Sequence, residues 1–245
     1  MEHNMGSPIY EPRKLDVGDV LKDVLSGKIG LPDLQRPFVW KNDKVRELLD
    51  SMLRGYPIGY IMLWDSPAEM ESKSQQIGEN EKAYKVPKSL VIDGQQRLTA
   101  LLAVIYGVDV RDKSYRTRSI RIAYDPIERI FKNADATTDR DARYVPSVSD
   151  AFAADHEKKS SAYRREFLQR LNASRSKRGE PKLSTEEEDE VEAGLNELLS
   201  LENYALPTLE IKDWADEEMV SDIFVRVNSQ GQTLKQDDFI MTLLS

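Results

Sequence analysis

The sequence LVIDGQQRLTALLAVIYG, residues 90–107, carries the clearest structural pattern in the 245-residue chain. Its first three residues are apolar and fit the end of a short buried strand. Polar residues and a glycine follow, as Asp93, Gly94, Gln95, Gln96 and Arg97. Apolar residues then return at helical spacing, at Leu98, Leu101, Leu102 and Ile105. The pattern predicts a buried strand that passes through a glycine turn into a helix.

This predicted junction has the chemistry of an anion site. The first backbone N–H groups of a helix have no partner within the helix, and the helix dipole favours negative charge there. Gly94 lets a ligand approach the backbone closely, and Arg97 can bind two phosphate oxygens at once. Gln95 and Gln96 offer donors and acceptors for a base, a ribose or a water. Asp93 has the oxygen chemistry that suits Mg²⁺ or an attacking water.

A purely structural interpretation of the same five residues is also consistent with the sequence. Asp93 would then cap the helix, Arg97 would pair with Asp93, and both glutamines would be surface residues. The junction is not a Walker A loop, because the chain contains no G-x-x-x-x-G-K-[ST] sequence. Chemistry alone leaves both interpretations open.

Two other segments offer polar groups that would suit the same site. In LQRPFVW, residues 34–40, Arg36 would add a second cation and Gln35 a polar contact, whereas the structural alternative places the two aromatic residues in the core. In FVRVNSQGQTL, residues 224–234, Asn228 would face the ligand, whereas the alternative is a plain turn between two helices. Each segment alone is a weak signal.

Composition limits the kinds of protein that this chain can be. The absence of cysteine excludes disulfides and thiol catalysis, and the two histidines, His3 and His156, exclude a histidine-rich metal site. No apolar run approaches the roughly 20 residues that span a bilayer, and no export signal is present, so we expect a cytoplasmic protein without membrane contact. The net charge of −8 argues against general coating of nucleic acid. Basic stretches at 111–121 and 158–182 are either solvated surface or local DNA contacts.

Periodicity elsewhere predicts a mixture of helices and strands. We expect helices over 17–25, over 45–53 with a cap at Asn42 or Asp43, after a capping box of Ser184 and Glu187, and around 220–227. We expect strands over 58–64, 89–92, 118–125 and 204–211, and a loop over 65–88.

Two of these strands carry more specific expectations. Alternation predicts that 118–125 is half-buried, and Pro207 predicts an edge or a bulge for 204–211. A second capping box, Thr233 with Gln236, opens a final helix that reaches Ser245 without an end signal. That ending favours a longer native chain.

Taken in order, the three polar segments resemble the N-terminal domain of the GmrSD-type, modification-dependent (type IV) restriction endonucleases. The resemblance rests on LPDLQRPFVW at 31–40, DGQQR at 93–97 and NSQG at 228–231, which are quite specific as a set. It is strong over 31–107 and 220–245, and weak between about 125 and 205.

The resemblance implies a fold like that of ParB and sulfiredoxin, in which a glycine, polar residues and an arginine at a helix start bind nucleotide phosphates. The expected fold class is α+β, with an α/β-like nucleotide-binding core and a mainly helical, charged second half. The resemblance also implies binding and hydrolysis of GTP or another nucleoside triphosphate, which controls DNA cleavage by a nuclease domain during defence against phage. Carried over by position, the expected site residues are Gln35, Arg36, Asp93, Gly94, Gln95, Gln96 and Arg97, with Asn228 as a further candidate.

One departure from the ParB-like pattern concerns the metal and the attacking water. The signature has a glutamate where this chain has Gln95, so Asp93 is the remaining acid and the expected Mg²⁺ ligand. Arg36, Arg97 and the helix N–H groups would hold the phosphates. Whether Asp93 or Gln95 activates the water stays open at this point.

The expected organisation is a core over 1–125, a charged helical insertion over 126–202, and a segment over 203–245 that completes the domain. Homo-oligomeric assembly is compatible with it. A competing hypothesis is a non-catalytic DNA-binding module whose cleft accepts a modified base or a backbone phosphate, as the two basic stretches suggest. A protein-interaction module is the third candidate.

Overall fold

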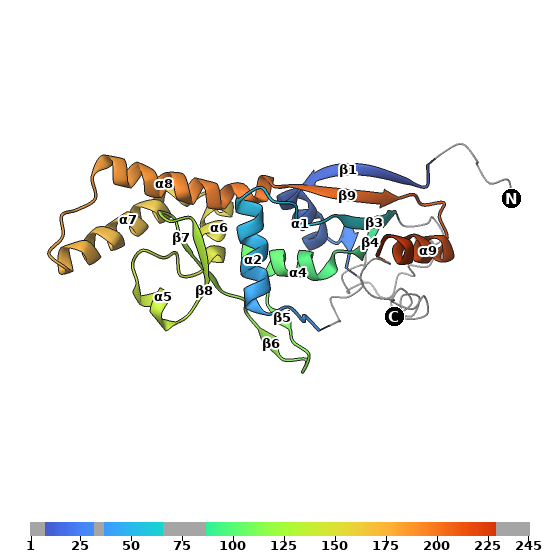
Figure 1. The fold of residues 1–245 in the computed structure, drawn as a ribbon, viewed down its shortest axis with the longest axis horizontal. Helices are drawn as coiled ribbons and strands as arrows, with labels where there is room; N and C mark the ends of the chain where they lie inside the picture. The colour runs from blue at the N-terminus through green and yellow to red at the C-terminus, as the bar shows by residue number, and fades with distance from the viewer. Residues whose placement is uncertain (1–7, 32–36, 66–86, 229–245) are drawn as a thin grey trace, which may run out of the picture. The chain divides into compact units, whose positions relative to one another are not determined.

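The computed structural model describes residues 8–31, 37–65 and 87–228 (Figure 1). The chain forms two compact units. Among the described residues, the first unit contains 8–31, 59–65, 87–95 and 205–228, and the second contains 37–58 and 96–204. The chain therefore passes between the units four times. Eight α-helices and nine strands lie in the described part, which confirms the predicted α+β class.

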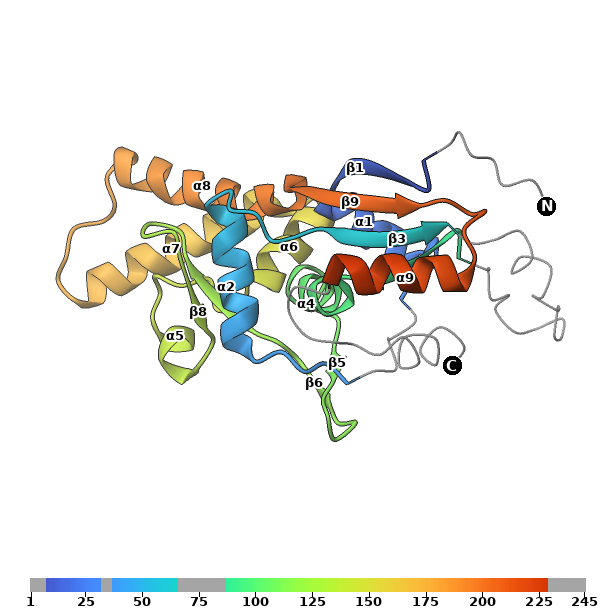
Figure 2. The same ribbon diagram turned by 45° about the vertical axis from the view of Figure 1, so that its right-hand side comes forward.

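The first unit is built on a five-stranded mixed sheet with the strand order β1-β9-β3-β4-β2. Its strands are β1 (Tyr10–Asp16), β2 (Ile29–Gly30), β3 (Ile61–Asp65), β4 (Ser89–Asp93) and β9 (Ala205–Ile211). Strands β1 and β9 are antiparallel and lie side by side in Figures 1 and 2. Strand β3 is parallel to β9 and antiparallel to β4, and β2 is parallel to β4.

Helix α9 (Glu217–Asn228) covers one face of this sheet. Its buried Val220 and Phe224 belong to one apolar cluster with residues of three strands, namely Met62, Trp64, Ile92 and Ile211. Because side chains alternate along a strand, Ile61 and Leu63 point to the opposite face, and both are buried there. Helix α1 (Val17–Leu25) has the predicted bounds and contacts β1 and β2.

The predicted position of Pro207 at an edge or a bulge is wrong. Strand β9 lies inside the sheet between β1 and β3, and its register with β1 is regular. Strand β3 pairs with β9 only from Thr208 onward. The missing N–H of Pro207 therefore breaks no bond of that ladder.

The second unit is mainly helical, and it contains residues 126–202, for which the sequence predicted helices. Its helices are α2 (Asn42–Leu53), α4 (Gln95–Ile105, from Gln96 on), α5 (Ala136–Arg140), α6 (Val148–His156), α7 (Ser160–Lys177), α8 (Thr185–Leu199) and the 3₁₀-helix η1 (Ser200–Asn203). Two hairpins accompany them, β5 (Val110–Arg111) with β6 (Thr117–Arg118) and β7 (Ile122–Asp125) with β8 (Ile130–Asn133).

The capping box that the sequence predicts for α8 is confirmed. The Ser184 hydroxyl accepts a hydrogen bond from the backbone N–H of Glu187 at 3.3 Å, and the Glu187 carboxylate accepts one from the Ser184 N–H at 2.8 Å. The predicted cap of α2 is wrong, because Lys41 precedes the first helical residue. The Asn42 side chain instead accepts a hydrogen bond from Arg118.

The second hairpin corrects another expectation. All four residues of β7 are buried, so the strand expected over 118–125 is shorter than predicted and is not half-buried. Tyr124 packs against Phe131 of β8, and its hydroxyl donates a hydrogen bond to the carbonyl of Gly194 in α8. Strands β5, β6 and β8 have no counterpart in the sequence prediction.

Several predictions fall on undescribed residues. Most of the expected loop at 65–88 and the final helix with its capping box lie outside the described part of the chain. None of the helices that the structure describes is long and apolar enough to cross a membrane.

Candidate functional site

The predicted junction of strand, glycine turn and helix is present. Strand β4 ends at Asp93, helix α4 begins at Gln95, and Gly94 joins them with a φ of 93°. Residues with a side chain rarely adopt this conformation, so the turn requires glycine. Gly94 rather than Asp93 directly precedes the first helical residue, which is the position of an N-cap.

A β-bulge lies immediately before the turn. Met62 of β3 is opposite Asp93, but the next residue, Leu63, is opposite Val91, so Ile92 is an additional residue of β4. Bulges re-aim the side chains that follow them and are frequent beside functional sites. The Asp93 carboxylate is half-buried and has no hydrogen-bond or ion-pair partner among the residues that the structure describes.

The two glutamines of the junction use opposite ends of their amides. The Gln95 Nε2 donates a hydrogen bond to the carbonyl of Val91 at 3.0 Å, within the first unit. The Gln96 Oε1 accepts one from the backbone N–H of Val39 at 3.0 Å, within the second unit. Gln95 therefore retains its carbonyl oxygen as an acceptor, and Gln96 retains its NH₂ group as a donor.

The other predicted site residues are placed less completely. Arg97 is half-buried in the first turn of α4. Gln35 and Arg36 lie outside the described residues, although Val39, three positions after Arg36, is the partner of Gln96. Asn228 is the last residue of α9, and its side chain is not described.

Arg118 is a positioning residue that the sequence did not reveal. Its guanidinium donates to the Asn42 side chain at 3.0 Å and to the carbonyl of Trp40 at 2.9 Å, and the backbone N–H of Phe38 donates to the carbonyl of Arg111 at 2.6 Å. These bonds hold the described end of the LQRPFVW segment within the second unit. No local pattern signals them, because Arg118 lies 76 and 78 positions from its two partners.

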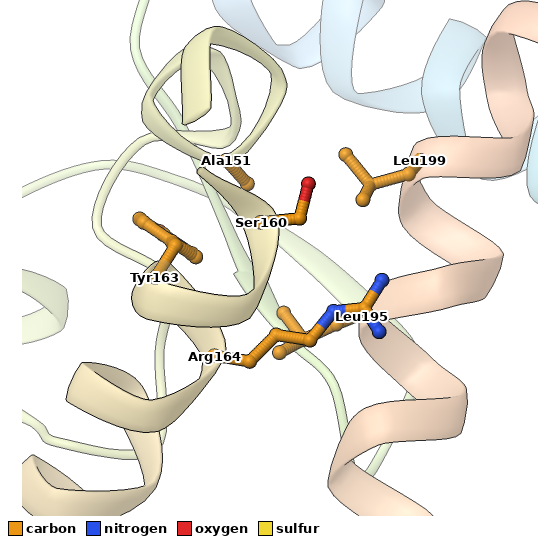
Figure 3. A pocket seen from close by; sticks show the side chains of 6 residues that line it. All are labelled: Ala151, Ser160, Tyr163, Arg164, Leu195 and Leu199. Carbon is orange, nitrogen blue, oxygen red and sulfur yellow. The ribbon is translucent and has the colours of Figure 1, made fainter. Parts of the chain in front are cut away.

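Two hollows of the second unit contain none of the predicted site residues. Figure 3 shows the smaller one, about 10 Å³, between α6, α7 and α8, lined by Ala151, Ser160, Tyr163, Arg164, Leu195 and Leu199. That volume holds about one water and cannot hold a nucleotide. The larger hollow, about 350 Å³, is an open groove between α7 and α8 with arginines on one side and Glu188 and Glu192 on the other.

Metal-binding side chains do not cluster in the described part of the chain. No group of three or more His, Cys, Asp or Glu side chains that could hold a metal ion occurs there. Asp93 is therefore a single acidic group at the junction, beside two amides.

Comparison with known proteins supports the relationship that the three segments indicate. A curated but uncharacterised protein of Methanocaldococcus jannaschii is 35% identical to this chain over 95 residues, which are 36% of this chain and 16% of that protein. The family model of the GmrSD restriction endonuclease, N-terminal domain, matches residues 17–245. This match includes the β4–α4 junction and every predicted site residue. The chain therefore belongs to the GmrSD restriction endonuclease N-terminal domain family.

Proposed function

We propose that this chain binds and hydrolyses a nucleoside triphosphate, and that it thereby regulates a DNA nuclease in a modification-dependent restriction system that defends against phage. The observation that carries the proposal is the turn at Gly94, which joins a buried strand to a helix with Arg97 in its first turn. The family membership supports the link to restriction. The proposed partners are a nucleoside triphosphate and DNA, reached directly or through a nuclease domain.

Phosphate recognition follows from the start of α4. The backbone N–H groups of the first turn carry the positive end of the helix dipole, and Gly94 adds no side chain that would keep a phosphate away from them. Arg97 lies in that turn and is half-buried, where a charge-assisted hydrogen bond is stronger than in bulk water. These groups support binding of the β- and γ-phosphates.

Asp93 fits the role of a Mg²⁺ ligand. It offers a half-buried carboxylate without a described partner, and Mg²⁺ prefers oxygen ligands and commonly takes one or two carboxylates together with substrate phosphates. When bound, Mg²⁺ would neutralise charge on the phosphate oxygens. Asp93 would hold it directly or through a water.

The hydrogen bonds of the two glutamine amides support different roles for Gln95 and Gln96 in hydrolysis. Because the NH₂ group of Gln95 is bonded to Val91, its remaining carbonyl oxygen can only accept, and a water that donates to it becomes oriented for attack. Because the carbonyl of Gln96 is bonded to Val39, its remaining NH₂ group can stabilise a phosphate oxygen. We therefore assign water orientation to Gln95, with Asp93 at the metal.

Calorimetric titration tests the proposal. GTP, ATP, CTP and UTP are each titrated with Mg²⁺ into the wild-type chain and into Arg97→Ala and Arg97→Lys. We expect one or more nucleotides to bind, and Arg97→Ala to raise Kd by roughly 10- to 100-fold, because it removes a charge-assisted contact. Arg97→Lys keeps the charge but not the fork of donors, so its Kd should be intermediate.

A matched control is Arg54→Ala, which removes one exposed cation paired with Asp50 on α2. It should leave Kd unchanged, and melting temperatures should show that all variants are folded. The proposal is lost if no nucleotide binds the wild type. It is equally lost if folded Arg97→Ala binds as tightly as the wild type.

A further inference from the structure

The two basic stretches of the chain differ in how far their cations are paired with carboxylates. In 158–182, Lys159, Arg175 and Arg178 pair with carboxylates at 2.6, 3.0 and 2.8 Å. The neighbouring helix α8 carries seven acidic residues and no basic one, so its field opposes the cations that remain on α7. The structure therefore weakens the case for nucleic-acid binding by this stretch.

The first basic stretch forms the β5–β6 hairpin. Residues 110–118 contain four basic residues and one acid, Asp112, in a chain whose net charge is −8. Arg111 and Lys113 are exposed and have no ion-pair partner among the described residues, and the Nε of Arg116 lies 3.6 Å from Asp112. Tyr115, which lies between Lys113 and Arg116 in the sequence, is 67% exposed. The hairpin tip projects away from the helices of its own unit in Figures 1 and 2.

The tip of the hairpin is held in one shape by Asp112. Its Oδ1 accepts hydrogen bonds from the backbone N–H groups of Ser114 at 2.7 Å and Arg116 at 3.0 Å. These bonds lower the pKa of Asp112 below its ordinary value and keep the carboxylate ionised. Asp112 therefore serves the turn, and it offsets only part of the positive charge of the tip.

The base of the hairpin is anchored equally well. Arg118 bonds to Asn42 and Trp40, and the Arg111 carbonyl accepts a hydrogen bond from Phe38. The Arg118 guanidinium is thus engaged in hydrogen bonds within the protein, whereas Arg111, Lys113 and Arg116 carry the exposed charge of the hairpin. A pre-shaped, anchored ribbon loses little conformational entropy when it binds a partner.

We propose that the β5–β6 hairpin is a DNA-binding element that contacts the backbone of duplex DNA through Arg111, Lys113, Arg116 and Tyr115. A two-stranded ribbon fits the major groove of a duplex, where cations and a tyrosine hydroxyl can contact phosphates on its sides. The choice of DNA as the partner rests on the proposed function. DNA binding by the hairpin does not itself require a bound nucleotide.

The experiment measures binding of a fluorescent duplex of about 25 base pairs by anisotropy, at salt concentrations from about 50 to 300 mM. The test variant combines Arg111→Gln, Lys113→Gln and Arg116→Gln. The slope of log K against log salt is negative, and each lost phosphate contact makes it less negative by about 0.9. The slope of the triple variant should therefore be less steep by about 2.7, and the variant should bind the duplex at least roughly tenfold more weakly at low salt. Tyr115→Asn keeps a residue that tolerates the φ of 57° and should weaken binding without changing the slope.

The matched control combines Arg165→Gln, Lys177→Gln and Lys182→Gln, three exposed cations of the other basic stretch with the same total charge change. It should retain the wild-type slope. Equal loss in the control, an unchanged slope in the hairpin variant, or a wild type that binds only single strands or RNA would each overturn the proposal. Nucleotide titration of the hairpin variant separates the two hypotheses, because loss of DNA with intact nucleotide binding concerns the hairpin alone.

Discussion

Gln95 and Gln96 are neighbours of the same type, yet their environments give them different chemistry. Each amide has one end fixed by a backbone group, and the fixed end determines what the other end can do. The sequence identified both residues as candidates but could not distinguish their roles. The distinction depends on Val39, which lies 57 positions before Gln96.

A pair of substitutions at Gln96 tests this assignment. Gln96→Ala leaves the Val39 N–H without its acceptor, so the free energy of unfolding should fall by about 1 kcal/mol. Gln96→Glu keeps an acceptor and should retain stability, but its negative charge should weaken nucleotide binding. Urea unfolding and calorimetry measure the two effects separately. Unchanged stability in Gln96→Ala, or wild-type nucleotide affinity in Gln96→Glu, would contradict the assignment.

At the scale of elements, helix α8 meets the turn between β7 and β8 at a glycine. A Cβ atom on Gly194 would lie 1.8 Å from the carbonyl oxygen of Pro126. Because this oxygen belongs to the backbone, relieving the clash would require the main chain to shift. Gly194→Ala should therefore lower the free energy of unfolding by about 3 kcal/mol, despite the better helix propensity of alanine. Chemical denaturation measures the change. Glu192→Ala, at an exposed position of the same helix, is the control and should stay within about 0.5 kcal/mol of the wild type.

The elements also show what local sequence can predict. Helix α1 and the capping box of α8 were predicted correctly, because helical periodicity and helix caps depend only on residues that are close in the sequence. Strands β5, β6 and β8 are only two to four residues long, and their existence depends on a partner strand rather than on a pattern of their own. The cap of α2 was mistaken because Asn42 serves Arg118, a contact that local sequence does not contain.

The candidate site also has a part that local sequence predicts and a part that it does not. The β4–α4 turn was predictable because five consecutive residues define it, and glycine was required at the one position with positive φ. The bulge at Ile92 and the bonds that hold Phe38, Val39 and Trp40 were not predictable, because they join segments far apart in the sequence.

At the scale of the whole molecule, stability at alkaline pH depends on two tyrosines of the second unit, the buried Tyr124 and the half-buried Tyr163. Burial raises the pKa of Tyr163 to about 12, with the charge of Asp150 adding to the effect, and burial also raises the pKa of Tyr124. An unfolded tyrosine loses its proton near pH 10. Between about pH 10 and 12 the unfolded chain therefore ionises while the folded Tyr163 stays neutral, so stability falls as pH rises.

Tyr163→Phe removes this contribution. The difference in unfolding free energy between wild type and variant should move by about 2 to 3 kcal/mol in favour of the variant from pH 9 to pH 12. Urea unfolding at several pH values measures it, and absorbance at 295 nm follows the phenol directly. A parallel pH dependence of the two proteins would refute the prediction.

The strand order of the first unit has a consequence for how the protein is made. Tyr10 of β1 pairs with Ile211 of β9, which is the only neighbour of β1 among the strands that the structure describes. A ribosome that adds about 5 to 20 residues per second needs roughly 10 to 40 s to reach that partner. During this interval β1 emerges as a strand without a ladder, which is the kind of segment that associates with other nascent chains. Its sequence, YEPRKLD, counters that hazard with a proline and four charged residues.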